Sequence, residues 1–287
     1  MQPNHSKLLD AKEKDLGEMT VRRTIPAVGC KAIGPWVFFD HMGPVTFNAG
    51  NGVNVRPHPH INLATVTYLF EGEILHRDSL GSYQPITPGA INLMVAGKGI
   101  VHSERERDEV KNQQHSLHGL QLWMALPEED EQMEPQFHHI DAASIPQFNH
   151  EGTDVRLLMG HAYSQQSPVK TFSPTLFMQL DIPQGKSLTL PSNQQTGIYL
   201  INGDVLINQQ PLAQHQMYVS EEQQIAIQAE THCTVIVIGG DNLGKRYLDW
   251  NFVSSNPQRI EQARNKWKNG GFPIIEDDND EFIPLPE

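Results

Sequence analysis

The chain has 287 residues, about twice the length of a typical domain, so two domains or lobes are expected. Its 34 acidic and 21 basic residues give a formal net charge of −13, which argues against direct nucleic-acid binding or attachment to an anionic membrane. A hydrophobic content of 38% with 19% charged residues is typical of a globular protein and excludes disorder for the bulk of the chain.

The cysteine content and the N-terminal sequence predict a reduced, cytoplasmic protein. Cys30 and Cys233 are too few for a disulfide framework, and no CxxC zinc pattern occurs. Residues 1–19 are polar and of mixed charge, without the apolar segment of a secretory signal. The longest apolar run, around 235–238, is far too short to span a bilayer, so no membrane contact is expected.

Short apolar or alternating segments between glycine- and proline-containing turns predict many short strands. The clearest of them are 63–70, 73–78, 90–96 and 117–126. Many short strands at this spacing predict a sandwich or barrel, and no long helical period occurs in the first 250 residues. The sequence YLFEGE, which starts at Tyr68, is similar to YLINGD, which starts at Tyr199, 131 residues later. This repeat predicts a duplicated β-barrel.

A helix is expected only near the end of the chain. Asn256 can cap it, Pro257 suits its first turn, and the sequence Asn-Gly-Gly at 269–271 stops it. One face of this helix carries Ile260, Ala263, Arg264 and Trp267. The acidic run 276–281 lacks the spacing and the glycine of an EF-hand loop, so we interpret it as a solvated acidic tail.

Two pairs of residues predict a metal site. His58 and His60 are two positions apart, and so are His102 and Glu104, and side chains at this spacing project from the same face of a strand. On facing strands the pairs form a site of three imidazoles and one carboxylate, which suits iron, nickel, copper, zinc or manganese. Without cysteine ligands, an open, catalytic type of site fits better than a closed structural zinc site. The alternative for the HxH pair alone is a hydrogen-bonded or surface pair.

The other histidines fit less specific roles. His41 and His76 are interpreted as structural residues that hydrogen-bond near the site, and His115 and His118 as packing or rim residues. In the second repeat, the offset of 131 places Thr189 and Pro191 where the HPH triplet would fall. We therefore expect no metal site there.

Several motifs in the first half resemble those of the pirins, two-domain members of the cupin superfamily. The similarity covers roughly residues 20–270 and is dense in the first half and thin in the second. The most specific matching words are HPH at 58–60, AGKGIVHSE at 96–104 and HGLQLW at 118–123. The chain departs from the family after the HPH triplet, where Ile61-Asn62-Leu63-Ala64 replaces the usual Arg-Gly-Phe-Glu. The pocket near the metal is then expected to lose an arginine and the acid at Ala64.

The resemblance implies an all-β bicupin. We expect an N-terminal cupin barrel with the metal site over 1–135, and a C-terminal cupin barrel without metal, followed by the short helix and acidic tail, over 136–287. The family's ligands fall on His58, His60, His102 and Glu104. The family's metal is generally iron, so Fe²⁺ is expected, with Ni²⁺, Cu²⁺, Mn²⁺ and Zn²⁺ as alternatives.

The resemblance also implies an activity. Several bacterial pirins resemble quercetin 2,3-dioxygenases, oxidoreductases that open a flavonol ring with dioxygen, and ring cleavage with loss of carbon monoxide is expected on that ground. The site alone predicts activation of a hydroxyl group on an aromatic enol, whose proton Glu104 would take as catalytic base. The alternatives are a non-catalytic iron-binding regulator of transcription or metabolic proteins, with a protein partner, and a cupin isomerase or sugar-binding protein.

Overall fold

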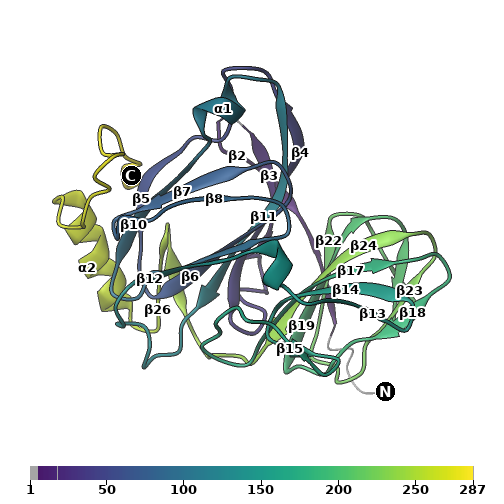
Figure 1. The fold of residues 1–287 in the computed structure, drawn as a ribbon. Coiled ribbons are helices and arrows are strands. Elements are labelled where there is room, and N and C mark those ends of the chain that lie inside the picture. Colours follow the sequence, from purple (N-terminus) through teal and green to yellow (C-terminus); the bar gives the residue numbers. More distant parts are fainter. Residues whose placement is uncertain (1–5, 18, 287) are drawn as a thin grey trace. The chain divides into compact units, whose positions relative to one another are not determined.

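The computed structural model describes residues 6–17 and 19–286, and its regular secondary structure is mainly β-strand (Figure 1). The predicted all-β fold with two cupin domains and a short C-terminal helix is confirmed. Residues 1–5 and 18 of the predicted polar N-terminal stretch lie outside the described residues. None of the described helices has the length and apolar character that crossing a membrane requires.

The chain forms two compact units, and each draws on separate stretches of sequence. The N-terminal barrel unit consists of 14–21, 40–142 and 243–287, and the C-terminal barrel unit of residues up to 13, 22–39 and 143–242. This division differs from the predicted one at 135/136, because the last 45 residues pack with the N-terminal barrel unit. Their buried side chains, such as Ile260, share an apolar cluster with Ile61 and Val101 of that unit.

The N-terminal barrel unit contains two antiparallel sheets. The larger has the order β12-β9-β6-β11-β4-β3-β2 and the smaller the order β5-β10-β7-β8. The larger sheet consists of β2 (Lys12–Asp15), β3 (Thr20–Ile25), β4 (Trp36–Phe47), β6 (Leu63–Glu71), β9 (Ile91–Val95), β11 (His115–Ala125) and β12 (Gln136–Ile140). The smaller consists of β5 (Val55–His60), β7 (Ile74–Asp78), β8 (Tyr83–Ile86) and β10 (Ile100–Arg105). The predicted strands in this half are thereby confirmed as β6, β7, β9 and β11. Two helical turns, α1 (Asp108–Lys111) and η1 (Ala142–Ser144), follow β10 and β12.

The C-terminal barrel unit repeats this strand order, which confirms the predicted duplication. Its sheets run β1-β22-β19-β24-β17-β14-β13 and β18-β23-β20-β21. Tyr68 lies in β6 and Tyr199 in β19, the third strand of each large sheet. The large sheet consists of β1 (Lys7–Asp10), β13 (Gln147–His150), β14 (Thr153–Met159), β17 (Thr175–Ile182), β19 (Gln195–Asn202), β22 (Gln216–Ser220) and β24 (Cys233–Gly240). The small sheet consists of β18 (Ser187–Thr189), β20 (Val205–Ile207), β21 (Gln210–Leu212) and β23 (Ala226–Ala229), and β15 (His161–Ala162) pairs separately with β16 (Gln165–Gln166).

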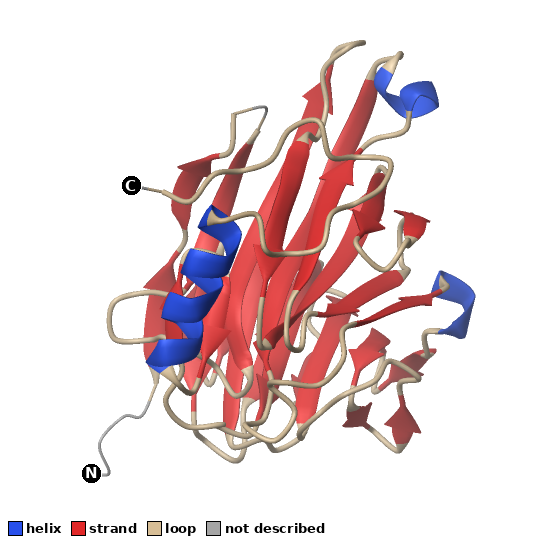
Figure 2. Cartoon of the chain, turned by 90° about the vertical axis from the view of Figure 1, so that its left-hand side faces the viewer, coloured by secondary structure: helices blue, strands red, loops and turns tan. Residues whose placement is uncertain are grey.

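The C-terminal segment adds a hairpin and a helix to the N-terminal barrel unit. The strands β25 (Tyr247–Asp249) and β26 (Phe252–Ser254) precede α2 (Pro257–Lys268), and the predicted helix is confirmed. The Asn256 side chain accepts a hydrogen bond from the backbone N–H of Gln258, which is the expected N-cap. Figure 2 shows α2 in blue and the loop after it passing across strands.

The prediction of a solvated acidic tail is wrong at Asp278. Its side chain is only 9% exposed and accepts hydrogen bonds from Ser103 and Arg105. The reason is that the tail meets a guanidinium and a hydroxyl on β10, which satisfy the carboxylate in place of water.

Candidate metal centre

The strands β5 and β10 bring three buried histidines together. In their antiparallel ladder, His58 lies directly opposite His102, and His60 lies two residues along the same strand. The ring centroids are 4.4 Å apart for His58 and His102, 5.0 Å for His60 and His102, and 5.0 Å for His58 and His60. One ring nitrogen of each lies within 4.8 Å of the others, so the cluster can hold a metal ion. The predicted meeting of these three side chains is confirmed.

Backbone carbonyls fix the tautomer of two of these rings. His58 Nδ1 lies 2.8 Å from the carbonyl oxygen of Arg56, and His60 Nδ1 lies 3.0 Å from that of Asn251. A carbonyl only accepts, so each Nδ1 carries the hydrogen and donates it. In the neutral ring, Nε2 then keeps a lone pair, and a hydrogen bond at the other nitrogen is typical of metal-binding histidines.

The third ring gives an independent test of whether a metal fits. Both ring nitrogens of His102 are buried and find no hydrogen-bond partner among the described residues. Leaving a buried polar atom unpaired costs about 1–3 kcal/mol, so such atoms in a native protein call for a ligand or water. A cation held between the three rings satisfies one of these nitrogens, and the donor set is of the kind that transition metals accept.

Burial also keeps the three rings in the form that binds metal. It lowers the pKa of His58 to about 4, although the hydrogen bond to Arg56 opposes it. Burial, and then the neighbouring imidazoles, lower the pKa of His60 and of His102 well below the ordinary histidine value. At neutral pH the rings are therefore uncharged, and no proton has to leave before a metal binds.

Glu104 lies on the same strand as His102, two residues further on. Opposite β5 the ladder shifts register between these two residues, so that Glu104 pairs with Val55. Thr67 Oγ1 on β6 lies 3.4 Å from Glu104 Oε1 and donates to it. Burial raises the pKa of Glu104 to about 7, against the opposing effect of the Thr67 hydrogen bond. The carboxylate lies outside the histidine cluster, so its role as a ligand stays a prediction.

The larger sheet supplies the neighbours of this cluster. The Trp123 ring on β11 meets His60 edge-on, with ring centroids 5.0 Å apart. Thr67 Oγ1 lies 2.8 Å from Gln121 Oε1, which competes with Glu104 for the single hydroxyl hydrogen of Thr67. Ala64 is on β6 too, but strand alternation places it on the opposite face from Thr67. The expected loss of a charge beside the metal at position 64 is therefore wrong, because this position is buried on the other side of the sheet.

Four further histidines make other contacts, as predicted. His76 Nε2 is 2.9 Å from Asp78 Oδ2, and the ring stacks on Phe137. His41 and His118 hydrogen-bond to each other at 2.8 Å, while His115 pairs with Glu106.

The Asn251 carbonyl, which accepts the hydrogen bond from His60, was not predicted, because a backbone oxygen 191 residues from His60 leaves no sequence signal.

The corresponding strands of the C-terminal barrel unit carry different side chains. β18 and β23 occupy the places of β5 and β10 in the strand order, and their paired residues include no histidine: Ser187 lies opposite Gln228, Leu188 opposite Ile227, and Thr189 opposite Ala226. Within 6–17 and 19–286, the three-histidine cluster is the single group of three or more such side chains able to hold a metal.

Comparisons with known proteins agree with this architecture. The family model Pirin matches residues 18–124, and the Pirin C-terminal cupin domain matches residues 177–273. A pirin-like protein of Caulobacter vibrioides is 41% identical over 285 residues, which cover 98% of this chain and 99% of that protein. The crystal structure of a quercetin 2,3-dioxygenase from Acinetobacter baumannii has a TM-score of 0.91 at 33% identity and covers 99% of this chain and 95% of its own. A bacterial pirin from Escherichia coli, solved in complex with nickel(II), shares the fold with a TM-score of 0.65 at 18% identity over 83% of this chain and 99% of its own.

Proposed function

Because the chain belongs to the pirin family, we propose that it is an iron-dependent dioxygenase that opens the ring of flavonols such as quercetin. The observation that carries this proposal is the cluster of three buried, neutral imidazoles, with a carboxylate two residues from one of them. The 33% identity to an Acinetobacter baumannii protein named quercetin 2,3-dioxygenase supports the choice of substrate.

We assign the metal ligands to His58, His60, His102 and Glu104, and the resident metal to Fe²⁺. Ni²⁺, Cu²⁺, Mn²⁺ and Zn²⁺ are the competing ions, since neutral imidazoles with a single carboxylate accept all of them. When bound, iron supplies a Lewis acid that makes a flavonol hydroxyl more acidic, and the redox chemistry that a reaction with dioxygen requires. The free thiols of Cys30 and Cys233 are in line with a reducing cytoplasm, where we place the reaction.

The chain's own side chains then bind and orient the substrate and move its proton. Glu104 is the catalytic base and takes the hydroxyl proton, while Thr67 holds its Oε1 by a hydrogen bond. Trp123, edge-on to His60, supplies an apolar surface beside the cluster for a flat aromatic ring. In the overall reaction both atoms of dioxygen enter the flavonol, the heterocyclic ring opens, and one carbon leaves as carbon monoxide.

The test is dioxygen uptake together with loss of the flavonol absorbance band, on protein loaded with Fe²⁺ and assayed for metal. The control is the His58→Ala/His60→Ala variant, measured in the same way. Turnover that follows iron content and vanishes in the control supports the proposal. Iron bound at about one equivalent without turnover overturns the flavonol activity and favours a non-catalytic iron-binding protein that acts through a protein partner.

A further inference from the structure

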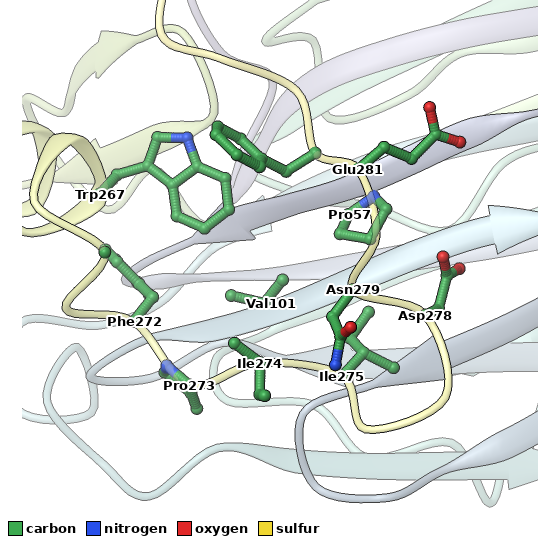
Figure 3. A pocket seen from close by; sticks show the side chains of 12 residues that line it. Pro57, Val101, Trp267, Phe272, Pro273, Ile274, Ile275, Asp278, Asn279 and Glu281 are labelled. Carbon is green, nitrogen blue, oxygen red and sulfur yellow. The ribbon is translucent and has the colours of Figure 1, made fainter.

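The end of the chain lies against the two strands that carry the histidines. We call residues 270–286 the C-terminal strap. The backbone N–H of Ile283 donates to the carbonyl oxygen of Pro57, the residue before His58, over 2.9 Å. Trp267 Nε1 donates to the Ile283 carbonyl over 3.0 Å, and Phe272 shares an apolar cluster with Val101. Figure 3 shows the strap running over the strands, with Asp278 and Glu281 on it and Val101 beneath.

Asp278 makes the polar contacts between the strap and β10. Its Oδ2 accepts from Ser103 Oγ over 2.7 Å and from Arg105 Nε over 2.7 Å, and its Oδ1 accepts from Arg105 Nη2 over 2.8 Å. Burial raises the pKa of Asp278, but the hydrogen bonds from Arg105 and Ser103 outweigh burial and leave the pKa below its ordinary value. The carboxylate is therefore charged at neutral pH, and its hydrogen bonds are of the strong, charge-assisted kind.

The residues that Asp278 holds alternate with the proposed ligands. On β10, the order is His102, Ser103, Glu104, Arg105, so the first and third side chains project from one face and the second and fourth from the other. The contacts follow this alternation, since Glu104 meets Thr67 inside the barrel while its two neighbours meet the strap. Asp278 thus binds the side chains of the two residues that flank Glu104.

The pairing of β10 differs on its two sides, and the irregular side is where the strand needs support. Opposite β7 the pairing is regular, but opposite β5 the register shifts between His102 and Glu104. The extra residue of this irregularity lies on β5, because three steps from His58 to Val55 face two steps from His102 to Glu104, and Ser103 is left without a paired residue on that edge. The three hydrogen bonds that Asp278 accepts from Ser103 and Arg105 constrain the strand at that point from outside the barrel.

We propose that Asp278 is a positioning residue for the metal centre, which acts on Glu104 and His102 through Ser103 and Arg105. This inference rests on the ligand set of the proposed function. Asp278 lies beyond residue 273, where the match to the Pirin C-terminal cupin domain ends. Asp278 would therefore act on the centre from a part of the chain that neither matched family model covers.

The experiment compares Asp278→Asn with Asp277→Asn in the full chain. Asp277 is exposed and adjacent, so its variant makes the same change of charge without touching β10. Each purified, metal-free protein is titrated with Co²⁺ alone against a competing chelator, and the visible absorption of the Co²⁺ complex reports its coordination geometry. We expect the Kd for Co²⁺ to rise about tenfold in Asp278→Asn, with altered bands. Asp277→Asn should match the wild type, and Asp278→Glu should recover part of the affinity.

Two failures can be told apart. If the wild type and His58→Ala/His60→Ala bind Co²⁺ equally, the ligand set itself is refuted. If the wild type binds and Asp278→Asn shows the same bands and a Kd within about twofold, the positioning role is refuted even where the Tm falls. If Asp278→Asn does not fold, Ser103→Ala provides the test of the positioning role, because it removes one of the three hydrogen bonds that Asp278 accepts. A smaller rise in Kd supports the role, and an unchanged Kd refutes it.

Discussion

Acid should destabilise the metal-free protein through the buried histidines, and His58 allows the size of this effect to be worked out. Its pKa is about 4 in the folded protein, against about 6.5 in an unfolded chain. Below about pH 6.5 the His58 imidazole binds a proton in the unfolded state, but in the folded state it stays neutral down to about pH 4. The stability present above pH 6.5 is therefore lost as the pH falls through this window. Each pKa unit corresponds to about 1.4 kcal/mol, so His58 contributes up to about 3 kcal/mol, of which about 2 kcal/mol is lost by pH 5.

The assay is equilibrium denaturation of metal-free wild type and of His58→Gln at pH 7.5 and at pH 5. Glutamine is polar and of similar size but does not titrate, whereas His60 and His102 are present in both proteins. Between the two pH values, the wild type should lose about 2 kcal/mol more unfolding free energy than the variant. Equal losses in the two proteins would refute the reasoning, because they would show that His58 is accessible to protons in the folded state.

Three further predictions follow from the same contacts. His102→Ala should abolish the rise in Tm on adding Ni²⁺ while changing the metal-free Tm little, since its ring nitrogens have no hydrogen-bond partner among the described residues to lose; a retained rise would contradict this. Thr67→Val should leave bound iron at the wild-type ratio but lower kcat about tenfold, because Glu104 loses its hydrogen bond; an unchanged kcat would argue against a role for Thr67. Ala64→Glu should lower the free energy of unfolding by a few kcal/mol, seen in denaturant titration, because the site is fully buried; a rise in metal affinity would instead place position 64 beside the ligands.

The sequence predicts those parts of the fold that depend on local patterns. Glycine and proline turns mark the strands, and the cap at Asn256 marks the helix, because both act over a few residues. The shared face of His58 and His60 also follows from a local rule, the alternation of side chains along a strand, whereas the pairing of β5 with β10 does not. The Asn251 carbonyl and Asp278 could not be found in this way. Their partners lie 191 and 173 or more residues away, and an acidic run has the same composition whether it meets water or an arginine.

The two barrels separate what the fold supplies from what the side chains supply. Both have the same strand order, yet β5 and β10 bring His58 opposite His102, whereas the paired residues of β18 and β23 include no histidine. A shared barrel therefore does not make a metal centre, because the chemistry depends on a few positions. Those positions are in turn oriented by groups outside the barrel strands, among them the Asn251 carbonyl at His60. A second copy of the barrel would not by itself form a second metal centre, since the one C-terminal segment of the chain packs with one barrel unit.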